Sequence, residues 1–522
     1  MKPLPVGISS LRFIIDDKLA YVDKTEIILP LVSQKGRYFL SRPRRFGKSL
    51  LVDTFKELFQ GNEPLFMDLA IHEKWDWTKK YPVVKIDWAS GGISSTDLLR
   101  TYASHILKEN ARELKLPEPD PSMPIGLQLE NLISGAAEQY GMPVVILVDE
   151  YDKPLLDNIE NPEKALEMRE GLRNLYSPLK RLDGLLQFVF LTGVSKFSKV
   201  NIFSGINNLS DITLDENFAT ICGYTQGDLE TTFAEHLAGV DWKELKTWYN
   251  GYNFLGEAVY NPFNILLFIS RNKSYRNYWF ETGTPSFLVK LMQKDRYFLP
   301  DMENIEAGEE LLSSFDIESM QPATLLFQSG YLTIKKQDFL MERQVFTLGF
   351  PNREVKNAFT DYLTGSYTGI HQERFPLQRS HYDALRSADL AGLEAALRRL
   401  FASIPWRNFT NNKIADYEGY YASVLYAFFS SITCTVIPED TTNHGQADLT
   451  VRLGNMVYVM EIKVIPGDLS GSVPNPALEQ VRERNYGEKY RREPGAQVFE
   501  LGLVFSQAQR NLVRFDAASP IN

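Results

Sequence analysis

The sequence of 522 residues has few of the features that mark disulfide-rich, zinc-binding or membrane proteins. It has two cysteines, Cys222 and Cys434, which lie far apart and in no metal-ligand spacing, so a reducing cytosol is the expected compartment. Its six histidines are scattered and form no zinc pattern. No apolar run approaches the length of a membrane span, and Asp16 and Asp17 stand where a signal peptide would need apolar residues. We therefore expect a cytoplasmic protein without a membrane segment.

A net positive charge is also absent. The formal net charge is −10 at pH 7, which argues against a protein that binds nucleic acid over its whole surface. We expect contacts with nucleic acid, DNA first among them, to use local basic patches at residues 42–48 and 482–492. The sequence has no internal repeat and no low-complexity linker, and its length suggests about three domains.

One segment near the C-terminus predicts a two-stranded hairpin. Two alternating runs flank the dipeptide Gly454-Asn455, a pattern typical of a two-residue turn. With that turn, Asp448 lies across from Glu461, and Lys463 lies on the same face as Glu461. Facing carboxylates repel each other, and hard divalent cations bind carboxylate oxygens, so the pattern predicts a Mg²⁺ site with a lysine beside it. The alternative is a lysine that only neutralises a surface acid pair.

The segments on either side of the hairpin are predicted to be helices. Residues 413–432 have helical periodicity and place Glu418 on an apolar face, where an acid needs a partner. A helix expected over residues 477–492 carries Gln480 and a basic stretch, which is either a solvated face or a contact with a phosphate backbone. The strands expected after it are residues 499–505 and 511–515.

This order of helix, two acid-bearing strands and polar helix resembles the PD-(D/E)XK nuclease superfamily, over roughly residues 376–522. The residues to which the resemblance assigns a role are Glu418, Asp448, Glu461, Ile462, Lys463 and Gln480. It implies that the facing acids ligate the metal with the carbonyl of Ile462, and that the lysine positions or activates the attacking water. The helix glutamate would support the site, and the glutamine would lie near the substrate. In one common version of the motif a tyrosine follows the glutamine by four residues. Here Arg484 holds that position, and Tyr486 comes two residues later.

A second pattern, near the N-terminus, has the order strand, basic loop, helix. A short strand at residues 37–41 leads into residues 42–49, RPRRFGKS, and an apolar helical pattern follows. This is the layout of a phosphate-binding loop, in which Lys48 would reach the β- and γ-phosphates of ATP and Ser49 would hold Mg²⁺. The loop residues expected at the nucleotide are Arg42, Arg44, Arg45, Gly47, Lys48 and Ser49. The GxxxxGK[ST] pattern has glycine where this chain has Arg42, so the octet alone also fits an ordinary basic turn.

Three apolar segments predict further strands of a parallel sheet. They are residues 83–86, 144–148 and 186–191. The middle segment ends in Asp149-Glu150, the form of a Walker B strand, in which Asp149 would bind Mg²⁺ through water and Glu150 would polarise the attacking water. Ligands of such sheets bind at the carboxyl ends of the strands, so we expect Thr192 or Ser195 to sense the γ-phosphate there. The alternative is a core strand that happens to end in acids.

Four motifs together resemble one family, whose members join an AAA-ATPase-like domain to a C-terminal PD-(D/E)XK nuclease domain. The motifs are SRPRRFGKS at 41–49, DEYDKP at 149–154, TGVS at 192–195 and WYNGYNF at 248–254. The resemblance covers nearly the whole chain, and in that family arginine replaces the first loop glycine as a rule. It implies an α/β protein with a P-loop parallel sheet, a helical or winged lid and an α/β nuclease fold. The expected domains are residues 1–222 (ATPase), 223–368 (lid and linker) and 369–522 (nuclease).

We expect an ATP-binding and ATP-hydrolysing protein whose nucleotide state controls a Mg²⁺-dependent nuclease acting on nucleic-acid phosphodiesters. The alternative is a non-enzymatic, nucleotide-dependent switch whose nuclease-like fold only binds nucleic acid or a protein partner. The complete set of two acids and a lysine argues for the enzyme. Many AAA-type ATPases form rings, so a homo-oligomer is compatible with the sequence, which does not count subunits.

Overall fold

The computed structural model describes most of the chain, and the described residues form two compact units. The described ranges are residues 1–89, 91–196, 209–279, 286–295, 297–309, 320–370, 373–405, 418–469 and 472–518. The first unit comprises Met1–Tyr278 and Ile305–Asn352, and the second comprises Trp279–Asn304 and Arg353–Asn522. The division into three domains expected from the sequence stays a prediction.

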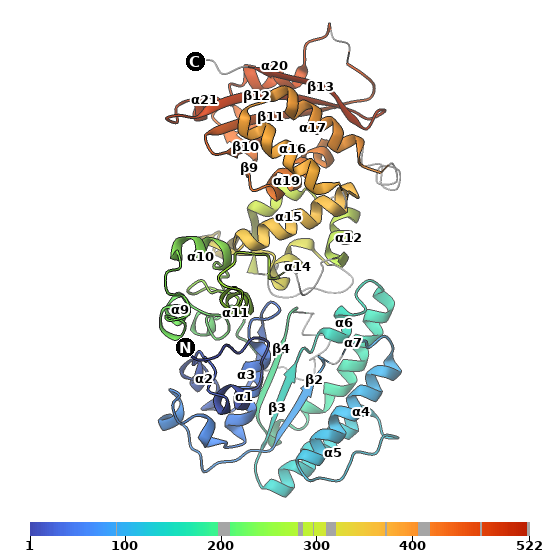
Figure 1. The fold of residues 1–522 in the computed structure, drawn as a ribbon. Coiled ribbons are helices and arrows are strands. Elements are labelled where there is room, and N and C mark those ends of the chain that lie inside the picture. The colour runs from blue at the N-terminus through green and yellow to red at the C-terminus, as the bar shows by residue number, and fades with distance from the viewer. Residues whose placement is uncertain are drawn as a thin grey trace. The chain divides into compact units, whose positions relative to one another are not determined.

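The first unit contains a five-stranded parallel sheet with strand order β2-β3-β4-β1-β5. Figure 1 labels β2, β3 and β4 of this sheet. Its strands are β1 (Gly36–Ser41), β2 (Val83–Asp87), β3 (Val144–Asp149), β4 (Leu186–Gly193) and β5 (Ser210–Asp211). The inner strands are buried almost throughout, because helices cover both faces of a parallel sheet, and this explains their continuous apolar runs. The four strands that the sequence predicts here are confirmed.

Capping residues fix where several helices of this unit begin. The side chain of Ser95 accepts a hydrogen bond from the backbone N–H of Leu98 at the start of α4. Asn261 accepts hydrogen bonds from two backbone N–H groups at the start of α11, where Pro262 takes the first helical position. The helices are α1 (Leu11–Asp16), α2 (Thr25–Val32), α3 (Lys48–Phe59), α4 (Thr96–Glu113), α5 (Ile125–Tyr140), α6 (Lys153–Leu156), α7 (Pro162–Tyr176), α9 (Gln226–Thr232), α10 (Trp242–Tyr249) and α11 (Pro262–Ser270).

A small antiparallel sheet, with order β6-β8-β7, completes the first unit. Its strands are β6 (Ile305–Gly308), β7 (Thr333–Leu340) and β8 (Arg343–Gly349), and helix α14 (Pro322–Ser329) precedes β7. The WYNGYNF motif lies against this sheet. Gly251 has a φ of 119°, and a Cβ atom added there would lie 2.1 Å from the carbonyl oxygen of Pro351. The backbone N–H of Asn253 also donates to the hydroxyl of Thr333 at 2.8 Å. The glycine of the motif is therefore required by a close approach of two backbones.

The second unit contains a mixed sheet with order β13-β12-β11-β10-β9, in which only the β11–β12 pairing is parallel. The strands are β9 (Thr435–Thr442), β10 (Gly445–Leu453), β11 (Met456–Ile465), β12 (Gln497–Ser506) and β13 (Asn511–Ala518). The predicted hairpin is confirmed: Leu453 pairs with Met456 and Leu449 with Met460, the register that a turn at Gly454 sets. Together with the parallel sheet of the first unit, this sheet confirms the α/β fold class.

The helices of the second unit are α12 (Ser286–Lys294), α15 (Arg353–Thr368), α16 (Arg374–Ser387), α17 (Leu390–Ala402), α19 (Glu418–Ser431), α20 (Pro476–Glu483) and α21 (Glu488–Arg491). Helix α19 is buried on nearly all sides and confirms the predicted helix, whose first five residues lie outside the described ranges. Among the described helices, none is long and apolar enough to cross a membrane.

The single helix expected over residues 477–492 is wrong, because the structure has two short helices there. Asn485 adopts a φ of 48°, which ends the first helix, and the turn directs Tyr486 into the core, where it is buried. Burial of this tyrosine against the sheet outweighs the local helical periodicity.

Candidate active sites

The basic loop lies between β1 and α3, and Gly47 and Lys48 determine its conformation. Gly47 has a φ of 92° and stands directly before the helix, so the loop backbone turns there in a way that favours glycine. The ammonium group of Lys48 is buried and donates to the carbonyl oxygens of Arg42 and Pro43, both at 3.0 Å. Burial lowers the pKa of Lys48, and the charge of Asp149 opposes the shift. The lysine is thus held at the centre of the loop, close to the acid of β3.

Arg42 is fully buried, and its side chain serves the fold. The guanidinium group donates to the carbonyl oxygens of Ser41 and Thr213 at 2.9 Å and of Phe218 at 3.1 Å. It also stacks over the ring of Phe254, with 3.9 Å between its Cζ atom and the ring centroid. These contacts hold the start of the loop against the rest of the first unit. They do not support the predicted contact between Arg42 and a phosphate, which stays a prediction.

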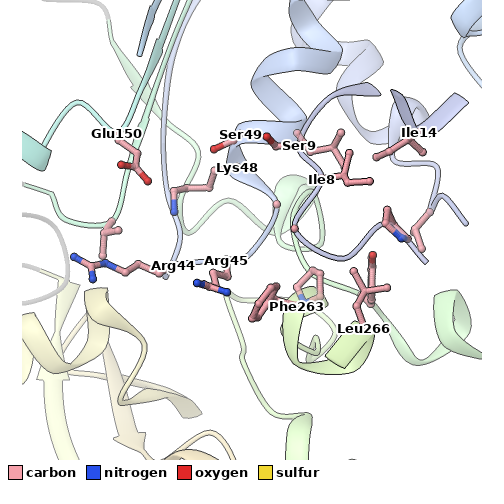
Figure 2. Close-up of a pocket in the computed structure, with 18 of the residues that line it drawn as sticks. Ile8, Ser9, Ile14, Arg44, Arg45, Lys48, Ser49, Glu150, Phe263 and Leu266 are labelled. Carbon is pink, nitrogen blue, oxygen red and sulfur yellow. The ribbon is translucent and has the colours of Figure 1, made fainter. Parts of the chain in front are cut away.

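A pocket of about 550 Å³ opens beside this loop, a volume typical of small-molecule sites (Figure 2). One end is polar and is lined by Arg44, Arg45, Lys48, Ser49 and Glu150. The other end is apolar, with Ile8, Ile14, Phe263 and Leu266 on its wall. The guanidinium carbon of Arg45 lies 3.9 Å from the centroid of the Phe263 ring, between the two ends. The pocket can therefore accept a ligand with an anionic end and an apolar end.

The acids Asp149, the last residue of β3, and Glu150, which follows it, lie beside the lysine. Asp149 is 1% exposed, and its Oδ1 accepts the backbone N–H of Glu150 at 3.0 Å. Its Oδ2 is buried without a hydrogen-bond partner among the described residues. Burial raises the pKa of Asp149, and the neighbouring Ser49 hydroxyl and Lys48 charge oppose the shift. A partner-free carboxylate oxygen beside a hydroxyl is a donor set that fits Mg²⁺.

The structure does not bring Thr192 and Ser195 into this pocket. Thr192 is fully buried, and its hydroxyl donates to the carbonyl oxygen of Leu40 at 2.9 Å. Ser195 uses its backbone, since its N–H donates to Asp152 Oδ2 at 2.6 Å. Val194 lines the pocket instead. Asp152 also lines it and had no role in the sequence prediction, although its place in the DEYDKP motif was a signal.

The second site lies on the hairpin of the second unit. The backbone N–H of Ile462 donates to Oδ2 of Asp448 at 2.7 Å, which places that carboxylate against β11. The ammonium group of Lys463 lies 2.9 Å from Oε1 of Glu461 and 3.4 Å from Oε1 of Glu418. The side-chain amide of Gln480 donates to Glu461 as well. The structure thus brings together all six residues that the sequence assigns to this site.

Glu461 has the strongest sign of a missing partner in this site. It is 1% exposed, and its Oε2 is buried with no hydrogen-bond partner in the part of the chain that the structure describes. Burial and the charge of Asp448 raise the pKa of Glu461 to about 7. Within the described ranges, no three acids, histidines or cysteines converge on one point as metal ligands. A divalent cation here would depend on two carboxylates and retain water, as Mg²⁺ usually does.

Sequence reasoning missed one acid near this site. Burial raises the pKa of Asp448, and the charges of Glu418 and Glu439 add to the shift, so Glu439 lies within electrostatic reach. Glu439 has a φ of 43° in β9. The sequence offered no signal for it, because the strand that carries it contains Pro438 and lacks a clear alternation.

The basic stretch of residues 482–492 is largely neutralised by ion pairs. Lys489, Arg491 and Arg492 pair with Asp440, Glu500 and Glu488, respectively. Arg482 and Arg484 are exposed and have no acidic partner among the described residues. The free positive charge available for a phosphate backbone is therefore smaller than the sequence suggests.

Comparison with known proteins gives the same two parts. A family described as predicted AAA-ATPase matches residues 5–203, and the PD-(D/E)XK nuclease superfamily matches residues 416–515. An uncharacterized protein in the vnfD 5' region of Azotobacter chroococcum mcd 1 is 43% identical in an alignment of 521 residues that covers 98% of this chain and 98% of that protein. No solved structure matches the chain.

Proposed function

This chain belongs to the family that joins an AAA-ATPase-like domain to a PD-(D/E)XK nuclease superfamily domain, and we propose that its nucleotide state controls cleavage of nucleic-acid phosphodiesters. One observation carries the proposal. Asp149 and Glu461, in separate units, are both buried, and each keeps one carboxylate oxygen without a hydrogen-bond partner among the described residues. A buried acid of this kind needs a cation, and each lies near a lysine of its own site.

In the first unit, ATP would bind with its phosphates at the polar end of the pocket. Lys48 and the N–H groups at the start of α3 would hold the phosphates, and the apolar end near Ile8 and Phe263 would take the base. Ser49 and Asp149 would hold Mg²⁺, which when bound neutralises charge on the phosphates. Glu150 lines the same end and would accept a proton from the attacking water.

In the second unit, Asp448 and Glu461 would hold a divalent cation, which when bound stabilises charge on the scissile phosphate. Lys463 is partly exposed and contacts Glu461, so it can reach a substrate phosphate or orient the attacking water. Gln480 donates to the same glutamate and would keep its carboxylate in one orientation. Ile462 fixes Asp448 through its N–H group, and a metal contact by its carbonyl is part of the proposal.

The testing experiment is a cleavage assay on plasmid DNA and on a structured RNA. The purified chain is incubated with Mg²⁺ or with EDTA, each with and without ATP. We expect Mg²⁺-dependent cleavage that changes at least several-fold when ATP is added, and hydrolysis of ATP under the same conditions. Binding of nucleic acid without cleavage in Mg²⁺ and Mn²⁺ would instead favour the non-enzymatic switch. Gel filtration with and without ATP would report a nucleotide-dependent oligomer.

A further inference from the structure

Glu150 has a backbone conformation that needs support from its surroundings. Its φ is 49°, in the left-handed region that residues with a side chain rarely adopt. Such a conformation persists only where neighbouring contacts determine it. On one side, the Oδ1 atom of Asp149 accepts the N–H of Glu150 at 3.0 Å. The support on the other side comes from the two residues that follow.

Tyr151 and Asp152 fasten the chain to the loop after β4. The N–H of Tyr151 donates to the carbonyl oxygen of Thr192 at 3.1 Å, and its hydroxyl donates to that of Ser195 at 2.8 Å. Oδ2 of Asp152 accepts the N–H groups of Val194 at 3.0 Å and Ser195 at 2.6 Å. The segment after Glu150 is therefore held at four points.

The contact between Asp152 and this loop leaves no spare room. Asp152 is 1% exposed, and a Cβ atom added to Gly193 would lie 2.3 Å from its Oδ1. Lys48 acts on it through its charge. A buried carboxylate that accepts hydrogen bonds from backbone N–H groups holds two chain segments together. Here it holds the chain two residues after Glu150 to the loop after β4.

We propose that Asp152 is a positioning residue for ATP hydrolysis, which holds Glu150 in the left-handed conformation that directs its carboxylate into the pocket. This inference rests on the proposed ATPase function. It predicts that loss of the Asp152 contacts slows hydrolysis and spares nucleotide binding, because the ammonium group of Lys48 is held by the carbonyl oxygens of Arg42 and Pro43 and not by a hydrogen bond to Asp152.

The test compares Asp152→Asn with Glu150→Gln, the double variant and Asp120→Asn, which changes an exposed acid of the same unit. Asparagine can place its one acceptor oxygen where Oδ2 lies, but its NH₂ group then replaces Oδ1, which accepts the N–H of Val194 at 3.3 Å, and the negative charge is lost. We expect Asp152→Asn to lower kcat about 10- to 100-fold, as small misplacements of catalytic groups do, with the Kd for ATP within about threefold of wild type. The double variant should be no slower than Glu150→Gln, because the carboxylate of residue 150 is already absent and its misplacement cannot lower kcat further.

An unchanged kcat in Asp152→Asn, or additive effects in the double variant, would overturn the inference and leave the proposed function standing. Loss of ATP binding along with kcat would also overturn it, in favour of a structural role. Absence of ATP hydrolysis in the wild type would overturn the proposed function and the inference together. If Asp152→Asn does not fold, Tyr151→Phe removes only the hydroxyl bond to Ser195. It should lower kcat with unchanged Kd, and an unchanged kcat would again contradict the inference.

Discussion

Ile462 and Asp448 are joined by a hydrogen bond of 2.7 Å between the backbone N–H of one and Oδ2 of the other. The bond crosses the hairpin, so the turn that sets the strand register also sets the orientation of the first acid of the site. It uses only one of the two oxygens. Asp448 is therefore both anchored by the fold and able to offer an oxygen to a cation.

The first prediction separates these two roles. Asp448→Asn keeps an oxygen that can accept the N–H of Ile462, so the fold should survive, but it loses the negative charge that holds a cation. We expect cleavage to fall by about 100-fold or more and the affinity for Mn²⁺ to fall with it, measured by plasmid nicking and titration calorimetry. Asp468→Asn, an exposed acid of the same unit, is the control. Cleavage at the wild-type rate in Asp448→Asn would remove this residue from the site.

Lys463→Gln tests the lysine. Glutamine can still donate to Glu461 but carries no charge and no transferable proton. We expect Mn²⁺ binding close to that of the wild type and cleavage reduced by about 100-fold. If Mn²⁺ binding weakens and cleavage at saturating Mn²⁺ is normal, the lysine only organises Glu461.

Lys48→Ala should abolish nucleotide binding, because the loop loses the only buried cation among its described residues that lines the pocket. The expected result is loss of the rise in melting temperature that ATP and Mg²⁺ give to the wild type. Lys56→Ala, on the same helix and paired with Glu113 at its surface, should keep that rise. A normal ATP affinity in Lys48→Ala would refute the phosphate-loop interpretation.

Arg42→Gly converts the loop to the GxxxxGK[ST] pattern and, in this chain, should weaken the protein. Three carbonyl oxygens lose a charged donor and Phe254 loses its stacking partner, with a cost of about 3 kcal/mol or more in the free energy of unfolding. Urea unfolding followed by fluorescence measures this directly. Arg44→Gly, in the same loop but lining the pocket, should unfold close to the wild-type midpoint.

The burial of His381 leads to a prediction of how the stability of the second unit depends on pH. Its ring is buried against Phe428, and burial lowers the pKa of His381 from 6.5 to about 4. The unfolded chain then binds the proton first as the pH falls. The stability contributed by the neutral ring is present above pH 6.5 and is lost as the pH falls toward 4, by about 3 kcal/mol in total. His381→Asn keeps a donor for the carbonyl oxygen of Leu377 and cannot titrate, so its stability should depend less on pH in this range. Equal slopes in the two proteins would contradict the prediction.

The parts of the molecule that local rules determine could be predicted from the sequence. The register of the hairpin follows from Gly454 and a period of two, and the loop between β1 and α3 follows from strand, glycine and helix in fixed order. These features depend on neighbours in the chain. The candidate site residues of these segments were predicted by the same reasoning, and the structure brings most of them together.

The features that depend on distant contacts could not be predicted. Arg42 was expected at a phosphate, but carbonyl oxygens more than 170 residues away hold its guanidinium group. The break after α20 arises because Tyr486 packs against the sheet, and Asp152 accepts hydrogen bonds from a loop about forty residues downstream. Hydrophobic periodicity carries no information about such contacts. The sequence patterns therefore assigned these residues to helices, strands or loops but did not identify the residues that they contact.

The chain leaves its first unit at Tyr278, contributes 26 residues to the second, and returns at Ile305 to complete the first before leaving it again after Asn352. During synthesis, the first unit therefore cannot finish folding until the segment that contacts Gly251 has emerged, by which time part of the second unit has already been made. A fragment that stops at residue 278 would lack the strands against which WYNGYNF packs. To separate the two sites, the chain should be truncated after Asn352 or its segments joined in a new order, because a truncation at residue 278 divides the first unit.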